Sequence, residues 1–162
     1  ATGRMGAQEF LTSSFSLQMS NGTLSRVPFS RTSLVRPRSE ISGWGVYTCQ
    51  PIPKNSRIID YAGEKISHRE SLRRERRQLP RGEVWCFTVD RRIVRDASVG
   101  GNIARFINHA SRPNCYTQVV GDVIWIRAAR NIVGGEELTY DYRTDGEATI
   151  PCRCRPGCQT LL

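Results

Sequence analysis

The chain has 162 residues, of which 38% are hydrophobic and 24% are charged, a balance typical of one small globular domain. This composition excludes a coiled coil and a wholly disordered chain, and the lack of about 18 consecutive apolar residues excludes a transmembrane helix. Because no secretory signal pattern opens the sequence either, we expect an intracellular protein that does not enter membranes.

The net charge is +9, from 24 basic and 15 acidic residues, and all the basic residues except Lys54 and Lys65 are arginine. A genome of high GC content would explain this bias, and so would a surface that faces an anion. Half of the six cysteines lie in one short C-terminal stretch. A disulfide framework would spread them more evenly, so a metal site or reduced thiols fit the spacing better.

Residues 1–38 are rich in Ser, Thr, Gly and Arg and show no sustained apolar period. They predict a basic leader that is extended or disordered, whose first ten residues could come from an expression vector. The composition changes near Ser39, where the folded domain is expected to begin.

Short elements follow in chain order. The segment Gly43-Trp44-Gly45 predicts a turn, and residues 46–49 after it predict a strand. Prolines interrupt the next loop, and residues 57–61 then predict a second strand that ends before Gly63.

The next element is a helix. Ser67 and Glu70 have the spacing of a capping box, so a helix should begin there and end before Pro80. It is nearly all polar and carries five arginines, which predicts a solvated helical insert over about residues 66–82.

Beyond this insert the pattern returns to short strands, predicted at 84–89, 93–94, 119–120, 123–126 and 138–140. Gly121-Asp122 predicts a hairpin turn between two of them, and residues 101–108 predict a short helical or turn segment. The sequence therefore predicts a mostly β domain with short helices.

Four segments stand out for their chemistry. They are Gly43-Trp44-Gly45, Arg105-Phe106-Ile107-Asn108-His109, Gly135 to Tyr142, and Cys152-x-Cys154-x3-Cys158. Each alone is a weak signal, since a lone Asn-His is more often structural and two tyrosines spaced by two often share one face of a strand.

In this order and spacing the segments resemble the SET-domain protein lysine methyltransferases, over residues 39–162. Residues 60–64, 101–102 and 113–115 add to the resemblance. It is nearest to the mixed-lineage-leukaemia-type enzymes, and it implies a SET domain at 39–143 and a cysteine-rich post-SET tail at 144–162. The implied fold has short β-clip-like sheets and a pseudoknot, together with the helical insert.

The resemblance implies transfer of a methyl group from S-adenosylmethionine to a lysine amine of a protein such as a histone or ribosomal protein. Only the neutral amine attacks, whereas the ordinary pKa of lysine is about 10.4. Burial in an apolar channel and a nearby sulfonium cation both lower that pKa. Alignment of amine, methyl and sulfur then supplies much of the remaining acceleration.

Site residues are carried over by position. The cofactor set is Ser42, Gly43, Trp44, Gly45, Tyr61, Trp85, Arg105, Phe106, Asn108, His109 and Tyr142. Asn108 and His109 are expected to bind largely through backbone contacts and the Asn amide. Tyr142 matches the active-site tyrosine whose hydroxyl orients the amine, and Tyr140 matches the position that limits how many methyl groups fit, which favours mono- or dimethylation.

Departures from the family pattern affect two sites. The tail keeps Cys152, Cys154 and Cys158 as expected zinc ligands, but Ser111 stands where the fourth cysteine is usual, and Cys115 is one substitute. Trp85 replaces a usual channel tyrosine, which keeps an aromatic wall and removes a hydroxyl.

The rival interpretation is a catalytically weak basic module that binds nucleic acid or chromatin. It is motivated by the arginine-rich insert and the basic leader, and the insert could also contact another acidic surface. Either protein is expected to be a monomer. The small size, the lack of a pre-SET region and the arginine bias suit a bacterial member or a trimmed catalytic fragment. A bacterial member would act in the cytoplasm or on host chromatin, and a eukaryotic member would act in the nucleus on histones; in either case the lysine would lie on an extended peptide.

Overall fold

A computed structural model describes residues 15–20, 23–28, 32–143 and 151–161. The chain divides into two compact units, Ala1–Arg31 and Thr32–Leu162. In the first unit, strands β1 (Phe15–Ser20) and β2 (Thr23–Pro28) pair antiparallel over six residues each. This hairpin was not predicted, because it lies in the segment expected to be extended or disordered, which has no alternating apolar pattern.

The second unit is mostly β, which confirms the predicted fold class. One sheet has the order β10–β11–β5, formed by Cys115–Val120, Val123–Ala128 and Arg57–Asp60. The predicted hairpin at Gly121-Asp122 is confirmed, with Gly121 at φ +61°, a conformation that favours glycine in such turns. The strands extend beyond the predicted ranges on both sides of this turn.

A second sheet brings distant segments together in the order β3–β4–β12–β9. Its strands are Leu34–Val35, Val46–Thr48, Glu137–Tyr140 and Asn108–His109. β12 runs antiparallel to β4 but parallel to β9, so that Tyr140 lies beside His109 and Thr139 beside Asn108. Two of the four motifs therefore meet on neighbouring strands. β3 was not predicted, since two residues show no period.

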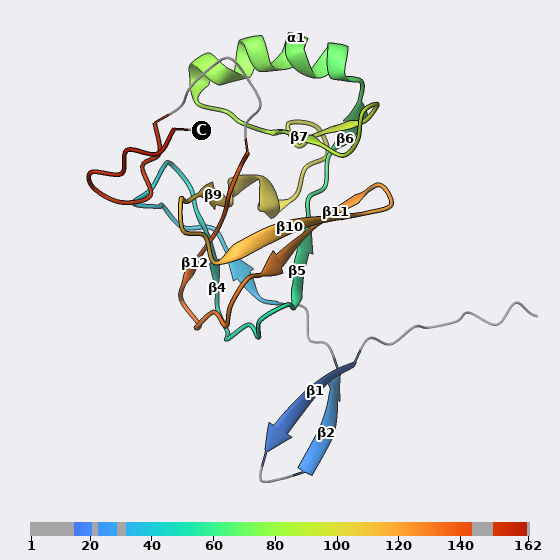
Figure 1. Cartoon of the computed structure of the whole chain (residues 1–162), viewed down its shortest axis with the longest axis vertical. Coiled ribbons are helices and arrows are strands. Elements are labelled where there is room, and N and C mark those ends of the chain that lie inside the picture. Colours follow the sequence, from blue (N-terminus) through green and yellow to red (C-terminus); the bar gives the residue numbers. More distant parts are fainter. Residues whose placement is uncertain (1–14, 21–22, 29–31, 144–150, 162) are drawn as a thin grey trace, which may run out of the picture. The chain divides into compact units, whose positions relative to one another are not determined.

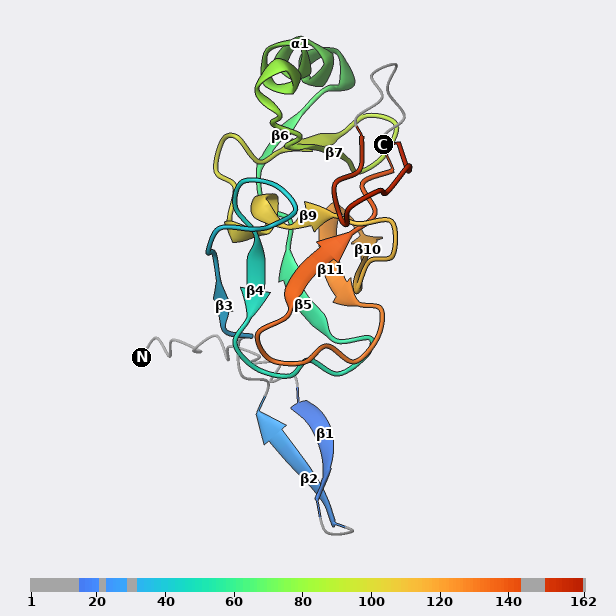
Figure 2. The ribbon, with the colours of Figure 1, turned by 90° about the vertical axis from the view of Figure 1, so that its left-hand side faces the viewer.

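The third sheet carries the insert. Its order is β6–β8–β7, formed by Glu64–Ile66, Val94–Asp96 and Cys86–Thr88. Helix α1 (His68–Gln78) and the 3-10 turn η1 (Leu79–Arg81) lie over this sheet (Figures 1 and 2). The predicted cap is confirmed, because the Ser67 side chain accepts a hydrogen bond from the Glu70 amide. β6 was not predicted, and β7 is shorter than expected.

α1 is less solvated than its composition indicates. Ser71 and Gln78 are buried against the rest of the unit. Arg74 Nη1 donates a hydrogen bond of 2.7 Å to the carboxylate of Asp96, and the Asp96 side chain is 0% exposed. The helix is thus held by polar contacts to β8 rather than by an apolar stripe. Among the described residues no helix is both long and apolar enough to cross a membrane.

Branched aliphatic side chains form the core between the first two sheets. The largest fully buried ones are Ile107, Ile124, Ile126, Ile132 and Leu138. They come from β11, β12 and the loops beside them, which fixes those strands against each other. A second 3-10 turn, η2 (Ile103–Phe106), leads from this core into β9.

Candidate active site

A cavity of about 350 Å³ lies where the motifs meet. The predicted cofactor residues on its wall are Ser42, Gly43, Trp44, Trp85, Arg105, Phe106, Asn108, His109 and Tyr142. Cys152, expected as a zinc ligand, also lines the cavity, and further lining residues that the sequence did not single out are Ile41, Leu79, Gly82, Glu83, Val84, Pro151 and Arg153. The insert and the cysteine-rich tail therefore both contribute to the same wall as the motifs.

The Asn108 side chain holds the loop around Trp44 in place. Its Nδ2 donates to the carbonyl oxygens of Ser42 (3.2 Å) and Trp44 (3.0 Å) and to Oε1 of Glu137 (2.8 Å). All three acceptors belong to the protein. In this structure the Asn108 amide, which was expected to contact a cofactor, supports the loop around Trp44.

Glu137 lies in the Gly135 to Tyr142 motif, but its role in supporting the loop around Trp44 was not expected from the sequence. It accepts hydrogen bonds from Ser39 Oγ (2.8 Å) and from the Tyr47 hydroxyl (2.9 Å) as well as from Asn108. Gly45 passes so close that a Cβ there would collide with the Glu137 carboxylate. Gly45 therefore serves this backbone approach and does not line the cavity. The only signal in the sequence was an acidic residue at the start of an apolar strand.

Arginines and aromatic rings alternate along one side of the cavity. The Arg36 guanidinium lies 4.7 Å from the Trp44 ring centre and 4.3 Å from that of Phe106, and Arg38 lies 4.3 Å from Trp44. Arg105 continues the series at 4.7 Å from Phe106. Such cation–π contacts are worth about 0.5–1 kcal/mol each at exposed sites. Arg36 and Arg38, which belong to the predicted leader of residues 1–38, thus pack against two aromatic rings of the cavity wall.

Two buried donors on the cavity wall have no partner among the described residues, Arg105 Nε and His109 Nε2. Burial lowers the pKa of His109 below its ordinary value, although the Asp141 carboxylate acts in the opposite direction. His109 is therefore neutral, and since its Nδ1 accepts from the Tyr142 amide at 3.3 Å, its proton belongs on Nε2. Buried donors without acceptors fit a cavity that receives a polar ligand.

Tyr142 also lines the cavity. Its hydroxyl donates to the Ile107 carbonyl oxygen at 2.8 Å, and its ring lies edge-on to His109 with the ring centres 5.5 Å apart. Burial raises the pKa of Tyr142 above its ordinary value, and the charge of Glu137 adds to this shift. The phenol therefore stays protonated and retains free lone pairs that can accept a hydrogen bond.

Behind Tyr142 lies a group of aromatic rings. Tyr140 is 4.9 Å from Tyr142 and 6.1 Å from Phe87, and Phe87 is 5.5 Å from Tyr61, all measured between ring centres. The Tyr61 hydroxyl donates to the Trp85 carbonyl oxygen at 3.0 Å. No hydrogen bond joins the Tyr140 hydroxyl to another residue in the described part of the chain. Tyr61 and Tyr140 thus adjoin the cavity without lining it, and Phe87 is an addition to the predicted set.

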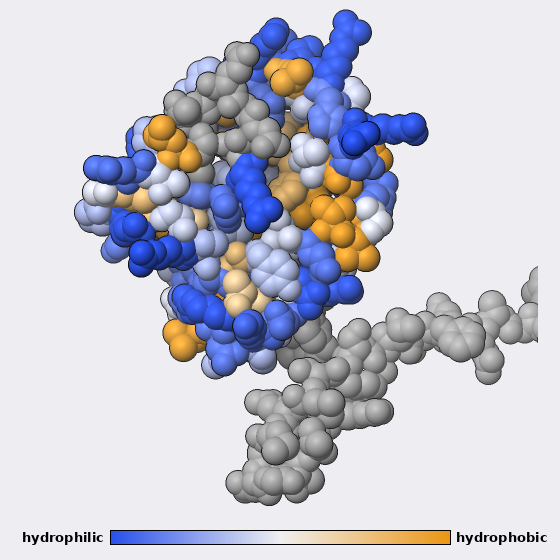
Figure 3. Space-filling model, in the orientation of Figure 1, coloured by the Kyte–Doolittle hydropathy of each residue, from blue (hydrophilic) through white to orange (hydrophobic). Residues whose placement is uncertain are grey.

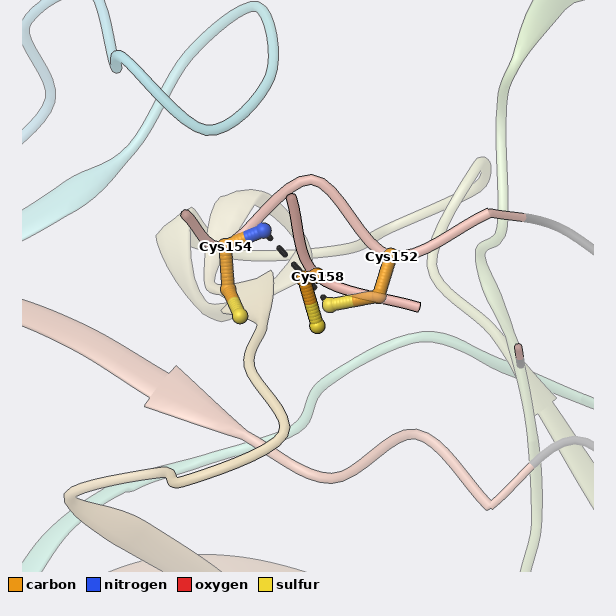
Figure 4. Close-up of side chains that lie close together, drawn as sticks. All are labelled: Cys152, Cys154 and Cys158. Carbon is orange, nitrogen blue, oxygen red and sulfur yellow. Dashed lines mark hydrogen bonds between the residues drawn. The ribbon is translucent and has the colours of Figure 1, made fainter. Parts of the chain in front are cut away.

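The three tail cysteines come together as predicted. The sulfur atoms of Cys152, Cys154 and Cys158 lie within 4.8 Å of one another, and the turn of the tail directs them to one place (Figure 4). Hydrogen bonds from Thr160 lower the pKa of Cys158 to about 6, so this thiol ionises readily. Thiolates are the preferred ligands of structural zinc.

Ser111 lies beside two of these cysteines. Its Oγ lies 3.4 Å from Cys154 Sγ and 3.6 Å from Cys158 Sγ. In a tetrahedral zinc site, oxygen and sulfur ligands are about 3.6 Å apart, given bond lengths of about 2.1 and 2.3 Å. The four groups thus fit a zinc ion, although a hydroxyl is a poorer ligand than a thiolate, and Arg155 already donates to it at 3.2 Å.

Cys115 does not substitute as the fourth ligand, which corrects one of our expectations. It is 0% exposed in the core, its thiol faces Asn114 Oδ1 at 3.4 Å, and it lies outside the cysteine cluster. Burial raises the pKa of Cys115 to about 12, so it remains a neutral thiol. Its role is to pack in the core.

Comparisons with known proteins agree with this arrangement. A family model described as "SET domain" matches residues 43–143. "Histone-lysine N-methyltransferase, H3 lysine-4 specific" from Eremothecium gossypii is 43% identical over 136 residues, which are 77% of this chain and 14% of that protein. The protein of the same name from Saccharomyces cerevisiae is 40% identical over 136 residues, covering 77% of this chain and 13% of its own length.

"Histone-lysine N-methyltransferase trithorax" from Drosophila melanogaster is 46% identical over 123 residues, covering 72% of this chain and 3% of that protein. The chain therefore spans at most 14% of the length of these three relatives. They are fungal and insect proteins, and they give no support to the bacterial source considered above.

Proposed function

The chain belongs to the SET domain family, and from this premise we propose that it transfers a methyl group from S-adenosylmethionine to a lysine side chain of a histone. The observation that carries the proposal is the cavity that joins the loop around Trp44, the Asn108-His109 strand and Tyr142. S-adenosylmethionine, when bound, supplies the methyl group. The unpartnered donors of Arg105 and His109, together with the Trp44, Phe106 and Trp85 rings, are the groups that would hold it.

The acceptor amine must be neutral before it can attack. No strong base is needed for this step, since the aromatic group around Tyr140, Tyr142 and Phe87 would bury the amine and disfavour its charged form. His109 is neutral, but its Nδ1 is engaged with the Tyr142 amide and is not free to accept the proton of the amine. Depression of the lysine pKa by burial therefore replaces general-base catalysis.

The Tyr142 hydroxyl orients the amine in this proposal. It is fixed by its hydrogen bond to the Ile107 carbonyl oxygen, and its remaining lone pairs can accept an N–H of the lysine. Accepting that bond aims the nitrogen lone pair along one line, which is the main requirement of an in-line transfer. Its raised pKa keeps the phenol neutral, so Tyr142 acts by position rather than as a base.

We further propose that the tail binds one zinc ion through Cys152, Cys154 and Cys158, with Ser111 at the fourth position. Cys152 also lines the cavity, so ordering of the tail by zinc would complete the cavity wall. The names of the relatives support a histone as the substrate, and we propose that the protein acts on it in the nucleus, as a monomer. A role limited to nucleic-acid binding has no use for the joint placement of Tyr142, Asn108 and His109.

The direct test is a methyl-transfer assay with the purified protein, S-adenosylmethionine and an N-terminal histone H3 peptide, read by mass spectrometry. We expect the mass of one or two methyl groups to be added at one lysine. Tyr142→Phe removes one hydroxyl and should lower turnover by about 100-fold or more while cofactor affinity stays within a few-fold, as for a group that acts mainly in the transition state. Wild-type turnover in the variant would reject this role, and no transfer to any histone or lysate protein would reject the enzyme.

A further inference from the structure

The outer face of α1 is a strip of arginines. Arg69, Arg73, Arg76 and Arg77 are exposed and recur at intervals of three and four residues, which places them on one side of the helix. The opposite side carries Ser71, Arg74 and Gln78, which face β8 and the rest of the unit. Hydrophilic residues cover the end of the molecule that carries α1 (Figure 3).

Three of these arginines are not neutralised by any carboxylate that the structure describes. Arg73 pairs with Glu70, but no ion pair joins Arg69, Arg76 or Arg77 to another residue among 32–143 and 151–161. α1 holds two acids: Glu70 is shared between Arg73 and Arg74, and Glu75 forms no ion pair with a described arginine but bonds with Cys86. The strip therefore presents uncompensated positive charge over about 12 Å, the length of eight residues of helix.

Further exposed arginines lie near both ends of the helix. At its start, His68 Nε2 contacts the Asp90 carbonyl oxygen at 2.8 Å, which ties the exposed pair Arg91 and Arg92 to α1. At its end, Arg81 is exposed in η1. A groove of about 420 Å³ runs along the strip and is lined by Arg69, Leu72, Arg73 and Arg76, among others.

The chemistry of the strip selects among anionic partners. Leu72, 60% exposed, is the one apolar side chain of α1, whereas protein interfaces rest on a cluster of apolar and aromatic anchors. α1 contains no Phe, Tyr or Trp on which unpaired bases could stack, and a ring nitrogen of its one histidine, His68, is engaged with the Asp90 carbonyl oxygen. Regularly spaced guanidinium groups without anchors match the phosphate backbone of a duplex.

We propose that the outer face of α1, extended by Arg81, Arg91 and Arg92, binds the phosphate backbone of duplex DNA without reading its sequence. This site lies on the opposite side of the helix from the contacts that hold the fold, so occupancy requires no rearrangement of the domain. The inference does not depend on methyl transfer, since the groups that carry it lie outside the described cavity wall.

The test is a fluorescence anisotropy titration of the full chain with a labelled mixed-sequence DNA duplex, at salt concentrations from about 50 to about 200 mM. The triple variant Arg69→Gln, Arg76→Gln, Arg77→Gln removes three guanidinium groups that would neutralise phosphates. Its slope of log affinity against log salt should be shallower by about 2 to 3, at about 0.9 for each phosphate. Circular dichroism checks that the helix is retained. No methyl donor or peptide is present, so the result is independent of catalysis.

The matched control is Lys54→Gln, Arg57→Gln, Arg127→Gln, which removes the same charge from the side of β5 and β11. Its affinity and salt slope should stay near those of the wild type. The proposal is overturned if wild type binds no duplex, or if both triple variants lose the same affinity, since net charge alone would then explain binding. A competition experiment gives a further test. If polyglutamate or single-stranded DNA displaces the labelled duplex from the protein at an equal concentration of charge, the outer face of α1 has no preference for a duplex and the proposal is overturned.

Discussion

Tyr140 and Tyr142 are two residues apart at the end of β12, yet their hydroxyl groups have different surroundings. The Tyr142 hydroxyl is held by the Ile107 carbonyl oxygen, whereas no described residue accepts a hydrogen bond from Tyr140. Burial raises the pKa of both phenols, so both are neutral donors. We propose that the unengaged hydroxyl of Tyr140 helps to hold the substrate amine beside Tyr142 and fills the space that an added methyl group would need.

Tyr140→Phe should raise the share of di- and trimethyl-lysine without abolishing activity, since mono- and dimethylation are the products we expect of the wild type. Loss of one hydrogen bond, worth about 0.5–1.5 kcal/mol, corresponds to a change in product ratio of up to about tenfold. Mass spectrometry of the peptide during the reaction measures the ratio, with Tyr61→Phe as a control that removes a hydroxyl already used by Trp85. Processive trimethylation by the wild type would show that Tyr140 does not limit the product.

Ser111 offers a second test at the level of one atom. Ser111→Cys places a thiol where the hydroxyl now lies 3.4 Å and 3.6 Å from two cysteine sulfurs, and should tighten zinc by about tenfold or more because zinc prefers sulfur to a hydroxyl. Competition against a chelator gives the affinity, and metal analysis gives the stoichiometry. Val119→Cys, on the exposed hairpin, adds a thiol away from the cluster and should leave both unchanged. Equal affinities in wild type and Ser111→Cys would place the metal elsewhere.

At the scale of elements, α1 is attached to the domain mainly through one side chain. Arg74 joins Asp96 on β8, Glu64 on β6 and Glu70 on the helix itself, at 2.7–2.8 Å. Burial would raise the pKa of Asp96, but hydrogen bonds from Ser98 and Arg74 hold it below its ordinary value. The helix therefore depends on a partly buried charge network in place of an apolar stripe.

Arg74→Gln should lower the free energy of unfolding by about 2–3 kcal/mol, the range for a hydrogen bond to a buried charge. Arg73→Gln, in an exposed pair with Glu70, should change it by about 0.5 kcal/mol or less. Chemical denaturation measures both. A lowered Asp96 pKa contributes stability above about pH 4 that is lost as the pH falls, so the difference between Arg74→Gln and wild type should narrow below about pH 4. Equal effects of the two variants would contradict this account.

Elements with a local signal were predictable from the sequence, and elements without one were not. The α1 cap and the turn at Gly121 depend on residues close together in the chain, so the sequence indicated both. β3 and β6 are two and three residues long and exist because distant strands accept them, which no local period can report.

For the site, the motifs indicated most of the cavity wall but not what supports it. Glu137 contacts Asn108, which is 29 residues away in the chain, and Arg36 contacts Phe106, which is separated from it by an even longer stretch of chain. Such contacts exist only once the fold has formed, and the parallel pairing of β9 with β12 has the same character. Resemblance to a family therefore supplied the residues, and the three-dimensional structure supplied the interactions that hold them.

At the scale of the whole molecule, the compact unit begins at Thr32, ahead of the boundary expected at Ser39. Residues 32–38 contribute β3, the two arginines beside Trp44, and the Pro37 carbonyl oxygen that accepts from the Gly45 amide at 3.0 Å. We propose that these residues belong to the catalytic unit.

A chain that starts at Thr32 should keep the melting temperature and cofactor affinity of the full chain. A chain that starts at Ser39 should lose about 1–3 kcal/mol of stability, from two cation–π contacts and a strand pair, and should bind S-adenosylmethionine more weakly. Thermal unfolding and calorimetry measure these quantities. Arg36→Gln with Arg38→Gln in the full chain separates the arginine contacts from the strand. Full affinity in the shorter chain would show that residues 32–38 are dispensable.

The position of β12 also has a consequence for how the protein is made. β12 lies between β4 and β9, so these two strands, which are far apart in the chain, have no common neighbour until residues 137–140 have left the ribosome. The loop around Trp44 and the Asn108-His109 strand can therefore be joined in one sheet only after β12, which is synthesised later than both, has formed. Under the proposed function, S-adenosylmethionine would not guide the early steps of folding, because the walls that would bind it are not yet joined, and it would stabilise only the finished domain.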